Sequence, residues 1–226
     1  MKTVGSILFD LDGTLTDPAD GIVRCIQYAL ETLNLSCPSP TELMSYIGPP
    51  LRESFTAICN SSDEALIEQA VKVFRERFST VGLFENTVYT DVPQMLAELQ
   101  SMSYSLFVAT SKPKVYAERI LQHFSLAGYF VEIFGNELDG RLDDKAEIIK
   151  ELLVKHQLSS TDALMVGDRK HDIIAAKNNA VSSVGVTYGY GSKQELFDAG
   201  VDYVCDSPQE VVTLVTKIQL SRSREI

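Results

Sequence analysis

Histidine and cysteine are scarce in this sequence, and their spacing argues against two common kinds of site. Three histidines and four cysteines occur among 226 residues. The cysteines show no Cys-x-x-Cys spacing and lie near no histidine pair, so neither a zinc site nor a disulfide framework is indicated. Reduced thiols of an intracellular protein are the expected state of Cys25, Cys37, Cys59 and Cys205.

Basic residues are fewer than acidic ones. The 20 Lys and Arg against 31 Asp and Glu give a formal net charge of -11 at pH 7. Because nucleic-acid affinity depends largely on Lys and Arg that displace counterions, no nucleic-acid polymer is expected as a partner. A small anion held through a metal ion fits this charge balance better than a polyanion on a basic face.

Long hydrophobic runs are absent as well. The first apolar stretch, Val4–Phe9, ends at Asp10 and is far too short for a signal-peptide core or a membrane span. We therefore expect a cytoplasmic protein without a membrane partner, either a monomer or a homodimer. Its 45% hydrophobic and 23% charged residues are typical of a globular protein.

Short apolar runs alternate with longer stretches of helical periodicity. The runs lack strict polar alternation, as strands buried on both faces of a parallel sheet do. They predict strands at Ser6–Phe9, Leu106–Ala109, Ala163–Val166, Ser183–Val186 and Tyr203–Cys205. Helices are expected at Val92–Met102, Lys114–Phe124, Asp144–His156, Asp172–Asn179, Ser192–Ala199 and Pro208–Gln219. This order predicts the α/β class, with a Rossmann-like, doubly wound parallel sheet.

From about Asp20 to Thr80 the strand signals vanish and apolar residues recur at helical spacing. We predict an all-helical cap domain at residues 16–82, inserted into an α/β core of residues 1–15 and 83–226. Such an insertion lies above the carboxyl end of the first strand, where ligands bind in open α/β sheets. Capping boxes, interpreted as structural helix starts, occur at Ser39–Glu42, Ser61–Glu64, Ser192–Glu195 and Ser207–Glu210.

Two carboxylates, Asp10 and Asp12, follow the first expected strand. Positions i and i+2 of an extended chain point to the same side, so both can face one site. Like charges this close are unfavourable unless a cation or a proton lies between them. Turns after strands also often carry Asp and Gly, so this pair alone does not distinguish a site from a turn.

A second acidic pair, Asp168 and Asp172, follows the strand expected at Ala163–Val166. Oxygen ligands from neighbouring strand ends suit Mg²⁺, which prefers carboxylates and keeps waters for a substrate phosphate. A turn residue at Asp168 and a helix cap at Asp172 are the alternative. That alternative leaves Asp10 and Asp12 at the same edge unexplained, so the sequence predicts a magnesium site.

Two further segments fit a phosphate site. Thr110, Ser111 and Lys112 lie between an expected strand and helix, where a hydroxyl group and free amides can meet an anion, although a capped helix start is the commoner meaning. Lys145 begins a helix, where the dipole disfavours a cation. A carboxylate or phosphate partner would compensate, and an exposed lysine is the alternative.

Together these motifs resemble those of the haloacid dehalogenase superfamily, in the branch of helical-cap phosphoglycolate phosphatases, 5'-nucleotidases and β-phosphoglucomutases. They are Asp10-Leu-Asp-Gly-Thr14, Thr110-Ser-Lys112, Lys145 and Gly167-Asp-x-x-x-Asp172, in the family's order. The resemblance implies a phosphoric monoester hydrolase acting on a small phosphorylated metabolite, either phosphoglycolate-like or a nucleoside monophosphate.

By this resemblance Asp10 is the nucleophile that forms an aspartyl-phosphate, and Asp12 first protonates the leaving group and then activates water. Mg²⁺ would be held by Asp10, Asp168 and the main-chain carbonyl of Asp12, with Asp172 in a supporting position. Dehalogenases of the family lack the second aspartate, so dehalogenation is disfavoured. A phosphosugar mutase and a catalytically silent phosphate-binding protein remain alternatives.

The resemblance also implies substrate contacts. Thr110 and Lys145 would hold phosphoryl oxygens as part of the catalytic set, with Ser111 and Lys112 beside them. Arg52 follows a Gly-Pro-Pro turn in the insertion and can bind a carboxylate or a second phosphate, although a solvated surface arginine is equally compatible.

Two other segments receive a structural interpretation. Arg169 is interpreted as a surface arginine, with a contact to the cap as the alternative. Tyr188–Gly191 lacks the complete dinucleotide fingerprint and is interpreted as a flexible loop near the edge of the sheet.

Overall fold

A computed structural model describes residues 5–139 and 141–222 of the chain. Six strands in this part form a parallel sheet in the order β5-β4-β1-β6-β7-β8. They are β1 (Ser6–Phe9), β4 (Ser105–Pro113), β5 (Glu132–Asn136), β6 (Ala163–Gly167), β7 (Ser182–Val186) and β8 (Tyr203–Cys205). The first strand thus lies in the middle of the sheet, between β4 and β6.

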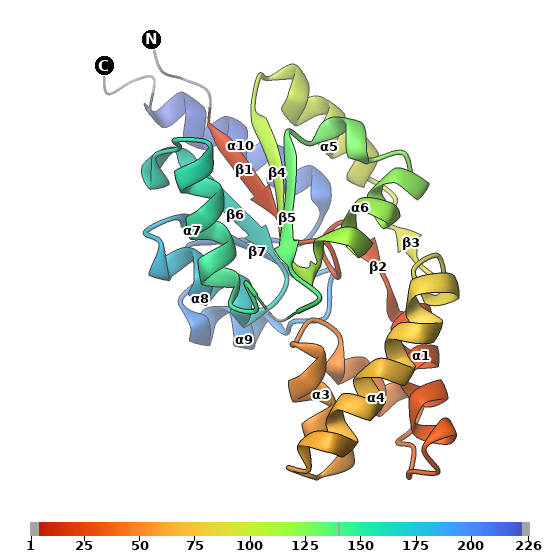
Figure 1. Cartoon of the computed structure of the whole chain (residues 1–226). Coiled ribbons are helices and arrows are strands. Elements are labelled where there is room, and N and C mark those ends of the chain that lie inside the picture. The colour runs from red at the N-terminus through yellow and green to blue at the C-terminus, as the bar shows by residue number, and fades with distance from the viewer. Residues whose placement is uncertain (1–4, 140, 223–226) are drawn as a thin grey trace.

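Helices cover both faces of this sheet (Figure 1). The core helices are α5 (Val92–Ser101), α6 (Lys114–His123), α7 (Lys145–Lys155), α8 (Lys170–Asn178), α9 (Lys193–Ala199) and α10 (Pro208–Arg222). Alternate residues of β1 face opposite sides: Ile7 and Phe9 join the apolar cluster that includes α5, α6 and α10, whereas Leu8 joins the cluster of α7 and α8. The predicted Rossmann-like, doubly wound fold is confirmed.

The segment after β1 is helical, as the fold prediction required. It contains α1 (Ala19–Thr32), α2 (Pro40–Leu43), α3 (Leu51–Cys59) and α4 (Glu64–Arg77), a 3-10 turn at Met44–Tyr46 and a π-helical turn at Phe78–Gly82. Helix α4 packs against α1 and α3. Figure 1 shows these helices, coloured orange to yellow, as a separate layer beyond the carboxyl ends of the core strands. The assignment of residues 16–82 to the cap and 1–15 and 83–226 to the core stays a prediction.

The chain enters and leaves the helical layer through two short paired strands. β2 (Thr16–Asp17) and β3 (Thr87–Val88) run antiparallel, with Thr16 opposite Val88 and Asp17 opposite Thr87. Beside them, the carboxylate of Glu85 accepts hydrogen bonds from Arg77 at 2.6 and 3.1 Å and from Arg24 at 2.9 Å. Both crossings are therefore tied to each other and to helices α1 and α4 of the helical layer (hereafter the cap).

The structure corrects several predicted helix starts and strand bounds. Strand β5 was not predicted, because its five residues include a charged residue, a glycine and an asparagine and it lies at the sheet edge. The capping box at Ser39–Glu42 is confirmed. The one at Ser61–Glu64 was wrong: Asp63 is the N-cap of α4, since its carboxylate accepts from two amides of the first turn. Helix α8 starts at Lys170, two residues before the predicted position.

Candidate active site

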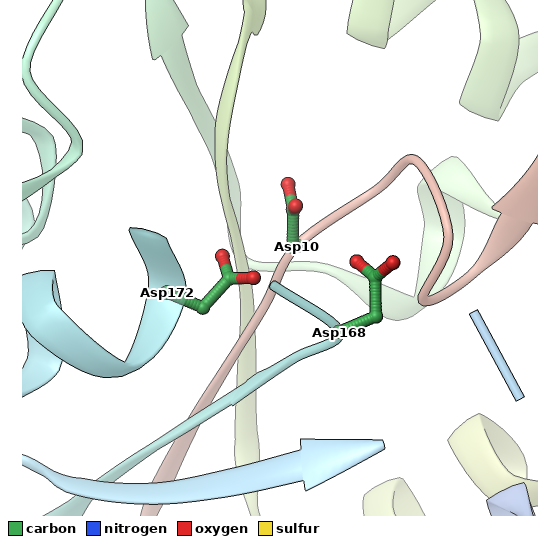
Figure 2. A group of neighbouring side chains, drawn as sticks. All are labelled: Asp10, Asp168 and Asp172. Atoms are coloured by element: carbon green, nitrogen blue, oxygen red, sulfur yellow. The ribbon is translucent and has the colours of Figure 1, made fainter. Parts of the chain in front are cut away.

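Three buried carboxylates meet where β1 and β6 end. Asp10 follows β1, Asp168 follows the neighbouring β6, and Asp172 lies in the first turn of α8. Each offers a carboxylate oxygen, and these oxygens lie within 4.8 Å of one another. Figure 2 shows the three side chains side by side. Adjacent parallel strands bring these residues together, although more than 150 positions separate Asp10 from Asp168 in the sequence.

Lys145, the first residue of α7, supplies positive charge to this acidic cluster. Its Nζ lies 2.9 Å from Asp10 Oδ2 and 2.5 Å from Asp172 Oδ1, and its side chain is 5% exposed. Burial by itself would lower the pKa of Lys145, but the Asp10 and Asp172 carboxylates outweigh burial and raise that pKa. The ammonium therefore stays charged, and the carboxylates of Asp10 and Asp172 share it.

Main-chain amides hold each carboxylate in place. Leu11 N donates to Asp10 Oδ1 at 2.8 Å, and Arg169 N donates to Asp172 Oδ2 at 2.9 Å. Tyr190 N donates to Asp168 Oδ2 at 2.8 Å. Because these donors belong to the backbone, the orientation of the acidic cluster depends little on flexible side chains.

The cluster carries more negative charge than one lysine balances. Burial raises the pKa of Asp168 to about 8, and the nearby charges of Asp172 and Asp10 add to that increase. Burial also raises the pKa of Asp172 to about 6, against the opposing effect of Lys145. A bound divalent cation would reverse both shifts, since it stabilises the ionised carboxylates.

Asp12 has a different partner from Asp10. Its Oδ2 lies 2.8 Å from Nζ of Lys112, whose ammonium also lies 4.6 Å from the centre of the Phe78 ring. The other oxygen, Asp12 Oδ1, is buried and has no hydrogen-bond partner within the described residues. Burial raises the pKa of Asp12, and the Lys112 charge opposes that shift. The two nearby aspartates thus lie in distinct electrostatic surroundings.

Thr110, Ser111 and Lys112 lie within β4 and not after its end, because the strand continues to Pro113. Thr110 is buried, and its hydroxyl accepts from Lys112 N at 3.2 Å. Helix α6 begins at Lys114, as predicted, and has no side-chain cap. The strand therefore extends beyond the predicted end at Ala109, and all three residues line the cavity beside Asp10.

A cavity of about 260 Å³ opens in front of Asp10 and Asp12. Its core wall includes Thr110, Ser111 and Lys112. Its remaining lining combines aromatic, apolar and charged side chains from cap and core: Tyr46, Pro49, Pro50, Leu51, Arg52, Glu68, Phe74, Arg75, Phe78, Tyr116, Asn136, Asp139 and Asp143 among them. The cavity therefore lies between the two layers and has room for a small organic phosphate.

Arg52 lines this cavity from the cap side, at the start of α3. Its guanidinium is paired with Glu64 at 2.6 Å and also contacts Glu68 on α4. A substrate anion would therefore compete with two carboxylates of the cap for this arginine.

Two segments beside the acidic cluster differ from the interpretation that the sequence favoured. Arg169 is not a surface arginine: its Nη1 donates to Ile47 O of the cap at 2.5 Å, so the alternative interpretation, a contact to the cap, is the correct one. The Tyr188–Gly191 segment packs on Asp168: a Cβ at Gly189 would lie 2.5 Å from the Asp168 side chain, and one at Gly191 1.8 Å from its carbonyl oxygen. The paired glycines are the one signal of this close approach that the sequence contains.

None of the described helices combines the length and apolar character that crossing a membrane requires.

Comparison with known proteins gives consistent matches. Residues 7–186 match the family described as haloacid dehalogenase-like hydrolase. A 5'-nucleotidase of Pseudomonas aeruginosa is 46% identical over 84% of this chain and 86% of its own length. A phosphoglycolate phosphatase of Vibrio parahaemolyticus is 30% identical over 92% of this chain and 95% of its own.

A solved structure is similar over nearly the whole chain. The crystal structure of a predicted phosphatase from Clostridium acetobutylicum has a TM-score of 0.91 and 40% identity, and the match covers 95% of this chain and all of that one. The similarity thus includes the helical layer as well as the sheet.

Proposed function

Because this chain belongs to the haloacid dehalogenase-like hydrolase family and is a phosphatase of that kind, we propose that it hydrolyses a small phosphomonoester with Mg²⁺ through a phosphorylated Asp10. The observation that carries this proposal is the contact of Asp10 with Lys145 inside the acidic cluster, with Asp12 separately paired beside the same cavity. The proposed substrate is phosphoglycolate-like or a nucleoside monophosphate, and the proposed location is the cytoplasm.

The residues present fit a magnesium ion. Three buried carboxylates face one lysine, which leaves an excess of negative charge that a divalent cation would balance. Lys145 contacts Asp10 and Asp172, whereas Asp168 is held by an amide and by the Thr14 hydroxyl at 3.4 Å. Asp10 and Asp168 would therefore hold the ion, with Asp172 in support and the Asp12 carbonyl as a further ligand. When bound, Mg²⁺ would neutralise charge on the phosphoryl group and on Asp10.

In the first step, a carboxylate oxygen of Asp10 would attack phosphorus while the bond to the leaving oxygen breaks. Asp12 would donate a proton to that oxygen, so that the leaving group departs with a hydroxyl group and the phosphoryl group stays on Asp10. Burial raises the pKa of Asp12 and thus favours the protonated form that this step needs. Lys145 would offset the charge that gathers on the phosphoryl oxygens, and Thr110, Ser111 and Lys112 line the same end of the cavity.

In the second step, Asp12, now ionised, would take a proton from a water molecule that attacks the phosphorus of the aspartyl-phosphate. The bond to Asp10 breaks, inorganic phosphate leaves, and Asp12 is again protonated for the next cycle. Lys112 lies 2.8 Å from Asp12 and stabilises the ionised form that this step requires. Burial thus favours the protonated form of Asp12, which the first step needs, and the ion pair with Lys112 favours the ionised form, which the second step needs.

The test is phosphate release from phosphoglycolate, nucleoside monophosphates and hexose phosphates, with Mg²⁺ or with a chelator. We expect metal-dependent release by the wild-type protein and a loss of several orders of magnitude in Asp10→Asn. Asp20→Asn, which removes the same charge at an exposed position of α1, is the matched control and should keep full activity. Release that persists in Asp10→Asn or in chelator would contradict the proposal.

A further inference from the structure

The turn at residues 47–50 of the cap lies directly against Arg169 of the core. Nη1 of Arg169 donates to Ile47 O at 2.5 Å, and a Cβ at Gly48 would lie 3.2 Å from Cγ of Arg169. Gly48 has φ of +103°, a conformation that other residues rarely adopt, and the next two residues are prolines without an N–H group. The turn is therefore stiff, and it presents the Ile47 carbonyl to the guanidinium.

Glu195 holds the other side of the same guanidinium. Its Oε1 accepts from Arg169 Nε at 2.9 Å and from Lys170 N at 2.9 Å. This carboxylate was expected to complete the capping box with Ser192, and only the Ser192 half of that box forms, from Glu195 N to Ser192 Oγ. The capping interpretation was thus incomplete, because Glu195 instead orients Arg169 toward the cap.

Arg169 also contacts the acidic cluster, but through its main chain. Its amide donates to Asp172 Oδ2 at 2.9 Å. A side-chain substitution therefore removes the contact to the cap and leaves the contact to Asp172 in place. Two other arginines make hydrogen bonds between the cap and the core, from Arg75 to Leu138 O and from Arg119 to Ser79 O. The cap therefore stays attached to the core when the Arg169 side chain alone is removed.

The turn forms part of the cavity wall. Gly48, Pro49 and Pro50 line the cavity together with Leu51 and Arg52, which follow at the start of α3. Asp10 and Asp12 line its core side. Any contact that holds the turn against the core therefore sets the distance between the carboxylates of Asp10 and Asp12 and the cap side of the cavity.

We propose that Arg169 is a positioning residue that holds the cap turn, residues 47–50, against the core and so shapes the part of the cavity that receives the leaving group. Arg169 itself touches neither the phosphoryl group nor Asp10. The expected effect of Arg169 on the reaction rate rests on the proposed phosphatase function, whereas its expected effect on the position of the turn does not.

The first test compares two phosphoryl donors in Arg169→Ala. For the best nucleoside monophosphate or hexose phosphate of the panel, kcat/KM should fall by roughly ten- to hundredfold, the range expected for loss of a charged hydrogen bond. Acetyl phosphate has a two-carbon leaving group, much smaller than a nucleoside or a hexose, and we expect it to make no contact with the turn, so its kcat/KM should change by less than about threefold. Guanidinium ion added to the solution should restore part of the loss. Equal losses for both donors, or no loss for either, would overturn the proposal.

Lys170→Ala is the matched control, because it removes the same charge one position away and keeps the amide that Glu195 accepts from. Lys170 is exposed and should behave as the wild-type protein does. Gly48→Ala tests the contact from the cap side. Its added Cβ conflicts with the positive φ and crowds Arg169, so it should reproduce the selective loss.

Hydrogen exchange gives a readout that needs no activity. In Arg169→Ala the peptide covering residues 43–55 should exchange at least severalfold faster than in the wild-type protein, while the strands β1 and β6 keep their protection. Unchanged exchange in this peptide would overturn the proposal even if the enzyme were active. Faster exchange in a protein that hydrolyses no phosphomonoester would support Arg169 as the tether and count against the proposed function alone.

Discussion

The ion pairs at the base of the cap permit a quantitative prediction for Glu85→Gln. Glu85 lies on the chain segment that returns to the core, and it joins Arg77 at the end of α4 and Arg24 on α1. The side chains of Glu85 and Arg77 are 19% and 21% exposed, so the pair is mostly removed from water. Glutamine keeps the shape and one acceptor oxygen, which makes the substitution a test of charge.

The expected cost lies between the values for exposed and for buried pairs. Exposed pairs contribute about 0.2–1 kcal/mol, and breaking a buried pair costs about 3–5 kcal/mol. We expect Glu85→Gln to lower the free energy of unfolding by about 1–2 kcal/mol at pH 7. For a chain of this size that corresponds to a decrease in Tm of roughly 2–8 °C.

The sign of the pH dependence follows from the lowered pKa of Glu85. The Arg77 hydrogen bond is the main cause of that lowering, and burial opposes it. The pair therefore stabilises the protein fully above the pKa of glutamate in the unfolded chain, and the stabilisation is lost as the pH falls through the lower folded pKa. The difference between wild type and variant should shrink on acidification below about pH 4.

The assay is thermal unfolding followed by circular dichroism at several pH values between 7 and 3. Glu76→Gln, at an exposed position beside Arg77 on helix α4, is the control and should melt as the wild-type protein does. Identical melting of Glu85→Gln and wild type at pH 7, or a difference that stays constant down to pH 3, would refute the reasoning.

Two further predictions concern the acidic cluster. Lys145→Met should destabilise the metal-free protein by about 3–5 kcal/mol, because Asp10 and Asp172 lose their shared ammonium. Mg²⁺ should then raise the Tm of the variant more than that of the wild-type protein. Equal increases in Tm would count against this account. Gly191→Ala should weaken Mg²⁺ binding measured by calorimetry, because the added Cβ would lie 1.8 Å from the main-chain oxygen of Asp168 and so displace the residue whose carboxylate is the proposed ligand. Gly128→Ala, where the added Cβ meets no atom within 4 Å, is the control and should bind Mg²⁺ normally. Unaltered affinity in Gly191→Ala would contradict the predicted displacement.

Much of the candidate site is predictable from the sequence because strand ends of a parallel sheet meet at one edge. That rule brings Asp10, Asp12, Asp168 and Asp172 together before any coordinates are known. The buried position of Lys145 follows from the same cluster, since a lysine at a helix start needs a negative partner. The helical layer is predictable as well, because apolar spacing changes its period after β1.

Other contacts were not predictable from the sequence, for different physical reasons. The pairing of Arg169 with Ile47 O joins residues 122 positions apart, and it depends on how the cap lies on the core. No local pattern encodes that orientation. Asp63 caps helix α4 in place of Ser61: its carboxylate accepts from Ala65 N, whereas the Ser61 hydroxyl accepts from Asp63 N before the helix begins. Both residue types are good helix caps, so the sequence does not decide between them. Strand β5 lies at the edge of the sheet, where a strand needs fewer apolar residues and gives a weaker signal.

The pairing of β2 with β3 has an evolutionary consequence. Because the two short strands lie side by side, the inserted segment begins and ends about one strand spacing, roughly 5 Å, apart. A tight two-residue turn is enough to bridge such a gap. A connection of this kind would allow the helical layer to be exchanged for another insertion without disturbing the core sheet. Such a replacement would change which molecules are admitted without moving the carboxylates on which the proposed reaction depends.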